Sequence, residues 1–594
     1  MRVSPTGSWS PYPAVPSLSL SRSFSLIGTV ALLVALAAGC TGVVGGAGGG
    51  VTPDPGGSAG APGSGGLGGG GGPDATAADC AKSGGVLNAG VTPLRRLTRD
   101  QFNNTVRDLI GATGQPADNL ADDEKIGPFH SNAIAPITQL EVQQHGEVAR
   151  ALATAAVANI GKISPCDLTT DTGAATTCAT QFLTQLGRRA YRRPLSAAEI
   201  QQYITLYALG KQGGGVQGGF RLVVQTMLQS PVFLYHHDVG ATGTPQPGVV
   251  ALSPYELASR ISYFLWNSMP DEPLFAAAAA GNLADEAALT AQVQRMLADP
   301  KAAATIASFH RQWLDVEDVG DQLKDATLFP AFSPSLTDAM TQELSRFSDY
   351  VVLQGDGLLK TLLTSNMAFP QDGLFAVYGV PQPAGFIAGT PVILDATQRA
   401  GILTQAAFLT KWSHADQTSP VHRGKLIRLN LLCGFIGSPP ANVNTAPPVP
   451  TPVTSTRQRF AQHESDPVCA TCHLLMDPIG LGLEHFDPIG AFRNVDGLGP
   501  VDATGKIISA GPDLDGSFNG ALDLANRLAQ SIEVQNCVAS QWFRFSMGRM
   551  ESTNDACSIQ SLRTSFSASG GNIRDLLARI ALSPAFRSVR LNGG

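Results

Sequence analysis

The chain has 594 residues and a net charge of −7; 43% of its residues are hydrophobic and only 15% are charged. This balance excludes a general nucleic-acid-binding protein, for which a surplus of basic residues is expected. Beyond the first 85 residues, about 510 residues remain, which is enough for several domains with sizeable hydrophobic cores.

Residues 1–39 are typical of a signal peptide. Two arginines are the only charged residues before the apolar run LIGTVALLVALAA (26–38), which is too short to span a bilayer. Small residues (Ala-Ala-Gly) precede Cys40, as they do at a lipoprotein-processing site. We therefore expect Cys40 to be the lipidated first residue of an exported protein. Ordinary cleavage near this point and an uncleaved membrane anchor are the alternatives.

Residues 40–85 consist largely of glycine, with serine and proline among them. Such a sequence offers too little apolar surface to form a core, so we expect a disordered tether. Attached to a lipidated Cys40, it would hold a globular body off a membrane, in the periplasm or at the cell surface. No later segment is long and apolar enough to span a membrane.

Helix signals dominate the remaining sequence. A capping box, in which Ser or Thr is followed three residues later by Glu or Gln, begins at Thr98, Ser196 and Ser253. Ser333-Pro334 is a further helix start, and Gly111 is placed to end the first of these helices. Alternating strand patterns are scarce, the best being PVILDA (391–396) and KIISA (506–510). The sequence therefore predicts a mainly α-helical protein.

Shifts in composition divide this helical body into several small consecutive domains. The segments at 211–219 and 240–250 are predicted to be a flexible loop and a connector, and the proline-rich segment 439–453 to be extended. The predicted divisions are a signal peptide (1–39), a tether (40–85), helical domains at 86–160, 161–245 and 246–385, a domain with a C-x-x-C-H segment (386–498) and a C-terminal helical domain (499–594).

The cysteine content is typical of an oxidising compartment. Besides Cys40 and the close pair Cys469/Cys472, six cysteines remain, an even number that indicates disulfides. Short spacing favours two of the pairs and elimination leaves the third, although the sequence alone does not fix the connectivity. These pairs are Cys166–Cys178, Cys537–Cys557 and Cys80–Cys433.

The segment VCATCHLLMDPIG (468–480) is typical of c-type haem attachment. Two thiols on one helical turn add to the haem vinyl groups, and the histidine that follows ligates the iron. Because such attachment takes place outside the cytoplasm, it agrees with export. We expect one covalent haem c on Cys469, Cys472 and His473. The alternatives are a zinc site completed by His463 and His485, a structural disulfide, or a redox dithiol.

The sixth iron ligand is left open by the sequence. Met476 follows His473 by three residues on the same helical side, so it cannot easily reach the opposite face of the iron. The remaining candidates are Met547, Met550, His485 and His463, and an open sixth position is a further option.

Other polar residues are predicted to be structural. The tetrapeptide Asp-Pro-Ile-Gly occurs twice, at 477–480 and 487–490, and is expected to form turns. Glu484 and Asp487 beside these turns are weaker candidates for haem-propionate or acid–base groups. The lone histidines are expected to be structural, and an arginine cluster is expected to form a solvated or salt-bridged helix face. These are His310, His414 and His422, and Arg188, Arg189, Arg192 and Arg193.

Several phrases together resemble a family of exported multidomain proteins that are abundant in planctomycetes and myxobacteria. Its domains are of unknown function and are often labelled planctomycete-cytochrome-like. The resemblance covers roughly residues 90 to 590 and implies a largely helical exported body with C-x-x-C-H in its C-terminal third. It implies no established activity, and no second haem is expected. The phrases are PLRRLTRDQFNNTVRDLIG, LGRRAYRRPLSAAEI, LQSPVFLYHHD, LSPYELASRISYFLWNSMPDE, TSPVHRGKLIRLNLLC, VCATCHLLMDPIGLGLEHFDPIGAFR and QWFRFSMGRM.

Together, these features predict an exported, lipid-anchored cytochrome c-like protein with a role in electron transfer or haem-based redox chemistry at the cell envelope. Its redox partner is not indicated. One alternative is a non-haem envelope scaffold or carbohydrate-associated binding protein, in which the CATCH segment is a disulfide or zinc staple. Another is an extracytoplasmic redox enzyme that degrades polymers.

Overall fold

The computed structural model describes residues 76–82, 88–164, 173–241, 248–437 and 446–591. The predicted signal peptide, Cys40 and most of the tether lie outside these residues. Of the residues that the structure describes, 58% are helical and 8% are in strands, which confirms the mainly α-helical prediction. No helix within the described ranges combines the length and hydrophobicity needed to cross a membrane.

The N-terminal helices enclose one hydrophobic core, which extends from Leu97 to Leu234 and also takes in Tyr263 and Met269. The capping boxes predicted at Thr98 and Ser196 are present. The helices of this part are α2 (Arg99–Ile110), α3 (Gln139–Ala158), α4 (Ile160–Ile163), α5 (Gly173–Tyr191), α6 (Ala197–Gln229) and α7 (Pro231–Leu234). The preceding helix, α1 (Ala77–Lys82), contributes no residue to this core.

The loop predicted at 211–219 corresponds to a sharp break within α6. At Gly214 and Gly215 the backbone leaves the helical conformation, and Gly215 has φ = +62°, a conformation that glycine adopts at little cost. The rings of Tyr207 and Phe220, on either side of this break, have centroids only 4.7 Å apart, so the chain turns back on itself here. The predicted loop is therefore confirmed at its centre, while the residues that flank it are helical.

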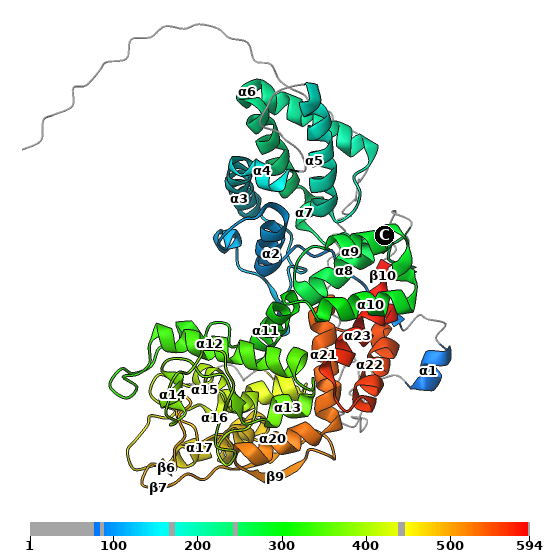
Figure 1. The fold of residues 1–594 in the computed structure, drawn as a ribbon. Coiled ribbons are helices and arrows are strands. Elements are labelled where there is room, and N and C mark those ends of the chain that lie inside the picture. The colour runs from blue at the N-terminus through cyan, green and yellow to red at the C-terminus, as the bar shows by residue number, and fades with distance from the viewer. Residues whose placement is uncertain (1–75, 83–87, 165–172, 242–247, 438–445, 592–594) are drawn as a thin grey trace, which may run out of the picture. The chain divides into compact units, whose positions relative to one another are not determined.

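A second and larger core is built from the remaining helices. Its centre includes Phe309 of α11 and Trp542 of α21, whose rings stack with centroids 3.5 Å apart. The longer helices of this part are α8 (Pro254–Trp266), α9 (Glu272–Ala279), α10 (Glu286–Leu297), α11 (Lys301–Trp313), α12 (Pro334–Asp349), α20 (Gly520–Gln530), α21 (Ile532–Met547), α22 (Ala556–Ala568) and α23 (Ile573–Leu582). Figure 1 shows α21, α22 and α23 lying side by side, and α13 packs against α20.

Shorter helices and two-stranded sheets complete this part. The helices are α13 (Leu359–Thr364), α14 (Leu374–Val377), α15 (Ala406–Lys411), α16 (Pro420–Leu426), α17 (Thr456–Ser465), α18 (Pro467–His473), α19 (Asp477–Leu481) and α24 (Pro584–Arg587). The antiparallel strand pairs are β1 (Lys125–Ile126) with β2 (Phe129–His130), β3 (Gly248–Ala251) with β10 (Ser588–Leu591), β4 (Met367–Ala368) with β5 (Val392–Ile393), β6 (Val495–Asp496) with β7 (Gly499–Pro500), and β8 (Thr504–Ile507) with β9 (Gly516–Asn519). The predicted strands at 391–396 and 506–510 thus occur in shortened form.

Two disulfides differ from the predicted pairings. Cys80 of α1 bonds to Cys557 of α22, and Cys433 bonds to Cys537 of α21. The predictions Cys537–Cys557 and Cys80–Cys433 are therefore wrong, because tertiary packing brings together cysteines that are far apart in the sequence. Cys178 is also disulfide-bonded, and Cys166 lies outside the described residues.

Arg192 corrects the expectation of a solvated arginine face. Its side chain is buried and donates hydrogen bonds to the carbonyl groups of Val232, Phe233 and Tyr235. The neighbouring arginines do form partly exposed ion pairs, Arg188 with Glu272 and Arg193 with Glu199. Arg189 donates to backbone carbonyl groups at the end of α2.

Candidate haem or metal site around His473

The C-x-x-C-H segment forms the short helix α18. Asp466 begins this helix, because its side chain accepts hydrogen bonds from the backbone N–H groups of Val468 and Cys469 and Pro467 occupies the first turn. Helical spacing then places the two cysteine side chains one turn apart, with His473 directly after them. No residue of α18 is buried, so the whole segment lies at the protein surface.

His473 is held by a buried carboxylate. Its Nδ1 lies 2.9 Å from Oδ2 of Asp477, the first residue of α19. His463 of α17 approaches the same oxygen, with its Nδ1 at 3.1 Å. Asp477 is only 1% exposed, and its other oxygen, Oδ1, has no hydrogen-bond partner among the described residues. Two imidazoles therefore share one carboxylate oxygen.

This geometry leaves a metal-binding nitrogen available on His473. A hydrogen bond from Nδ1–H to a carboxylate sets the tautomer in which Nε2 carries the free lone pair. Metal-ligating histidines commonly have this second partner, which orients the ring and raises its basicity. Alternatively, one ligand atom from each of His463, His473 and Asp477 could hold a metal directly, because these atoms all lie within 4.8 Å of one another.

The thiols of α18 differ from the other described cysteines. Cys469 and Cys472 are free, whereas Cys80, Cys178, Cys433, Cys537 and Cys557 are all disulfide-bonded. Desolvation raises the pKa of Cys469, as do the charge and hydrogen bond of Asp466. A reactive redox dithiol requires the opposite shift, because its attacking cysteine has a lowered pKa. The site therefore does not favour the thioredoxin-like alternative.

Of the four candidate sixth ligands, the structure brings His463 next to His473. Their ring centroids are 4.1 Å apart, and the Nδ1 atoms of both rings face the same oxygen of Asp477. Met547 is buried in the larger hydrophobic core at the end of α21, and Met550 is half exposed beside Gly127.

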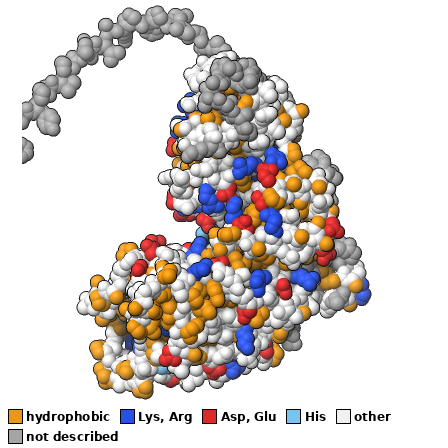
Figure 2. Space-filling view, viewed as in Figure 1, with side chains coloured by type: hydrophobic (Ala, Val, Ile, Leu, Met, Phe, Trp, Pro, Cys, Tyr) orange, Lys and Arg blue, Asp and Glu red, His pale blue; other side chains and the backbone are white. Residues whose placement is uncertain are grey.

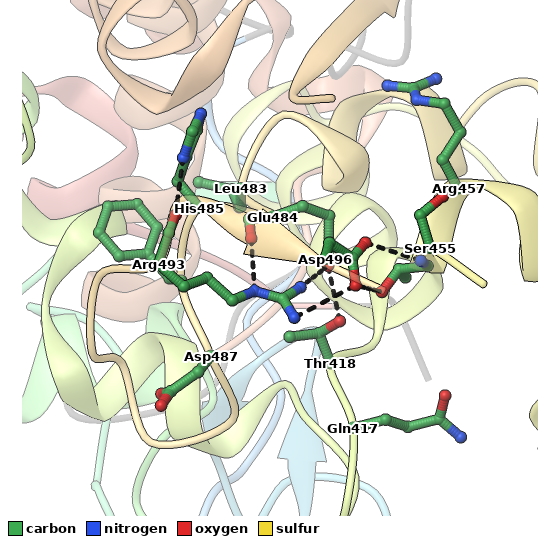
Figure 3. Close-up of polar contacts among 12 residues, drawn as sticks. Gln417, Thr418, Ser455, Arg457, Leu483, Glu484, His485, Asp487, Arg493 and Asp496 are labelled. Atoms are coloured by element: carbon green, nitrogen blue, oxygen red, sulfur yellow. Dashed lines mark hydrogen bonds and ion pairs between the residues drawn. The ribbon is translucent and has the colours of Figure 1, made fainter. Parts of the chain in front are cut away.

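His485 is engaged elsewhere. Its Nδ1 lies 2.9 Å from the carbonyl oxygen of Arg493, and its ring stacks on Phe492 with centroids 5.1 Å apart. Figure 3 shows His485 beside the ion-pair network centred on Arg493. These contacts give His485 a structural role in the loop that follows α19.

Glu484 belongs to the same network. It is 1% exposed and accepts hydrogen bonds from Thr418 (2.7 Å) and Arg493 (2.6 Å), with Arg423 at 3.8 Å. In Figure 3, the Arg493 guanidinium lies between Glu484 and Asp496. Both hydrogen bonds go to Oε2, whereas Oε1 has no hydrogen-bond partner among the described residues. Through Oε2 the carboxylate links Thr418 to Arg493 and so stabilises the loop.

The second Asp-Pro-Ile-Gly segment forms the expected turn, in which Asp487 accepts hydrogen bonds from the backbone N–H groups of Ile489 and Ala491. The first segment has a role that the sequence analysis missed, because its aspartate is the buried partner of His473. The signal that could have revealed it is the four-residue spacing between His473 and Asp477, which places both on neighbouring helical turns.

The lone histidines have packing roles. His310 is fully buried, with Nδ1 2.7 Å from the carbonyl oxygen of Ile306, and burial lowers its pKa to about 4. The rings of His414 and His422 lie 5.3 Å apart, and burial lowers the pKa of both, that of His422 to about 4.

Five family models match successive stretches of the chain, and each is described as a protein of unknown function. They are DUF1587 (95–158), DUF1595 (178–238), DUF1592 (252–380), DUF1588 (399–496) and DUF1585 (515–586). The DUF1588 match includes α17, α18 and α19, and therefore the whole His473 site. No curated protein and no solved structure matches the chain. The chain is thus similar, over five successive stretches, to protein families of unknown function.

Proposed function

We propose that this protein is an exported, lipid-anchored cytochrome c-like protein that carries one covalent haem on Cys469, Cys472 and His473 and transfers electrons at the cell envelope. The observation that carries this proposal is the state of the site residues. The two thiols are free, although the other described cysteines are disulfide-bonded, and the adjacent His473 has Nδ1 held by Asp477.

The surface of α18 is compatible with a covalently attached macrocycle. Val468 is 60% exposed and Leu474 is 40% exposed, so two apolar side chains that flank the cysteine–histidine segment are open to solvent. A bound haem would remove such surface from water. The haem would supply one-electron chemistry, while His473 would ligate the iron and Asp477 would fix the orientation of that imidazole.

The proposal is tested by expressing the full chain together with a cytochrome c maturation system and staining a denaturing gel for covalent haem. Wild-type protein should stain, and Cys469→Ser and Cys472→Ser should each weaken or abolish the stain. Thr471→Ala, which changes the residue between the two cysteines, is the matched control and should stain normally. Folded, exported wild-type protein without covalent haem would refute the proposal.

The lipid anchor needs its own experiment. Incorporation of labelled palmitate into the exported protein should be lost in Cys40→Ser, while export itself continues. Labelled protein from the Cys40→Ser variant would show that the anchor is not at this position.

The clustering of His463, His473 and Asp477 favours a second candidate, a non-haem metal site. Two imidazoles and one carboxylate suit zinc or iron better than magnesium or calcium. In this case His463→Ala would remove the metal from haem-free protein, as measured by elemental analysis. Under the haem proposal, His463→Ala would leave covalent attachment intact, because His463 is not one of the residues that bind haem.

A further inference from the structure

A small polar cavity is lined by residues at the start of α2, in α8 and α11 and at the end of α21. These four helices are labelled in Figure 1. The cavity has a volume of about 30 Å³. Its polar lining includes Arg95, Asn267, Ser308 and Gln312, and Asp100, on the exposed side of α2, also contributes to it. Neither the proposed haem nor its ligands involve this cavity.

Arg95 is the unusual member of this lining. It is only 8% exposed, yet its guanidinium makes no hydrogen bond or ion pair with any residue that the structure describes. Burial lowers its pKa to about 10, so the group still carries its charge at neutral pH. A buried cation without a partner is strongly destabilising, which is why such groups are almost always paired.

Asp238 attracts Arg95 and partly offsets the lowering of its pKa. This carboxylate and Asp555, however, make their ion pairs with other arginines. Arg260 lies 2.7 Å from Asp238, and Arg549 lies 2.7 Å from Asp555. Both of these arginines add positive potential at Arg95 and lower its pKa further. Among these groups, Arg95 therefore represents a surplus positive charge.

Arg192 adds to this surplus, since it contacts carbonyl groups and the Tyr263 hydroxyl, with no carboxylate partner in the described part of the chain. His236 lies close to Arg95, Arg192 and Arg260, and burial together with these charges holds its pKa well below the usual value. His236 is therefore neutral and contributes no further positive charge, but it supplies no negative charge either.

We propose that the cavity binds a small monovalent anion, of the size of chloride or formate, against Arg95. Water can accept hydrogen bonds from the guanidinium but cannot balance its charge. The side-chain amide of Asn267 makes no hydrogen bond within the described residues and is a second donor on the cavity wall. A volume of about 30 Å³ holds only a few atoms, and Asp100 disfavours polyanions by repulsion.

Bromide, a heavy analogue of chloride, provides a direct test. Crystals of the full mature protein grown in sodium gluconate and transferred to sodium bromide should show an anomalous peak within hydrogen-bonding distance of the Arg95 guanidinium. Crystals transferred to fresh gluconate should show none. A cavity without bromide at a saturating concentration would overturn the proposal, whatever the behaviour of any variant.

A solution experiment complements the crystals. At constant ionic strength, replacing gluconate by chloride or by formate should raise the melting temperature in a saturable way. Arg95→Met should lose this rise, whereas Arg107→Gln, which changes a half-exposed arginine on α2, should retain it. An equal rise in Arg95→Met would show that the anion acts elsewhere and would also overturn the proposal.

Discussion

The Nδ1 atom of His473 lies 2.9 Å from Oδ2 of Asp477, and the Nδ1 atom of His463 lies 3.1 Å from the same oxygen. Asp477 is buried, so the carboxylate is shielded from water and its hydrogen bonds are stronger than they would be at the surface. The proposed iron ligand is therefore oriented by a group from the next helix, in the manner of a metal-ligating histidine with a carboxylate partner.

The first prediction concerns the reduction potential of the haem-loaded protein. Asp477→Asn keeps the size of the side chain but removes the negative charge that makes His473 a stronger donor to ferric iron. We expect the potential to rise by roughly 30–60 mV, which corresponds to a three- to tenfold change in the ratio of the two oxidation states for one electron. A spectroscopic redox titration measures this shift.

Asp466→Asn is the matched control for this variant. Asp466 caps α18, and asparagine is also a good cap, so the potential should stay close to that of the wild type. If Asp477→Asn has the wild-type potential while retaining covalent haem, then Asp477 does not tune the iron ligand.

The second prediction concerns the stability of the loop after α19. Glu484→Ala removes a buried carboxylate that pairs with Arg493 and lies near the fully buried Arg423. Among the described residues, Arg493 then keeps only Asp496 as an ion-pair partner, and Arg423 keeps hydrogen bonds but no ion-pair partner. We expect the free energy of unfolding to fall by about 3–5 kcal/mol. Denaturant titration followed by circular dichroism measures this loss. Glu464→Ala, at an exposed position of α17, should change the stability by less than about 0.5 kcal/mol.

The third prediction is a pH dependence that originates at Glu343. Burial raises the pKa of this carboxyl to about 7, while the Tyr378 hydroxyl donates a hydrogen bond to it. Between about pH 4.5 and 7, the folded state holds a proton here that the unfolded state has lost. The stabilisation from this proton is therefore complete below pH 4.5 and is lost as the pH rises to 7.

Glu343→Gln should remove this dependence, because glutamine stays neutral and still accepts a hydrogen bond. The unfolding free energy of wild type relative to the variant should fall by about 3 kcal/mol between pH 4.5 and pH 7.5, since one pKa unit corresponds to about 1.4 kcal/mol. Urea titrations at several pH values measure the difference. A constant difference across this range would contradict the prediction.

The sequence predicted the local features of the fold well and the long-range features poorly. Helix starts at Thr98 and Ser253 depend on hydrogen bonds within four residues, so the sequence pattern is sufficient to locate them. The glycines at 213–215 likewise located the break in α6. By contrast, short sequence spacing failed to identify the disulfide partners, because packing between distant helices brings Cys80 to Cys557 and no local pattern records such packing.

The candidate site also combines residues that a local sequence pattern predicts with residues that only the fold brings together. The sequence identified Cys469, Cys472 and His473, because the attachment pattern is contiguous. It did not identify Asp477 as the hydrogen-bond partner of His473, because the role of Asp477 depends on its burial and on the approach of α17. His463 was one of four candidates for the sixth iron ligand, and the structure places it beside His473 on the same carboxylate oxygen.

The last prediction separates structural cysteines from the proposed cofactor-binding pair. Replacing both Cys433 and Cys537 by alanine removes a disulfide between residues 104 positions apart, and we expect the free energy of unfolding to fall by about 2–5 kcal/mol. In haem-free protein, the double variant Cys469→Ser, Cys472→Ser should lower the free energy of unfolding by less than about 1 kcal/mol, because these thiols are free and lie on α18, which has no buried residue. Thermal or denaturant unfolding of both proteins under non-reducing conditions measures the contrast. Equal losses would mean that the α18 cysteines also stabilise the fold, which would favour a structural staple over a haem-attachment site.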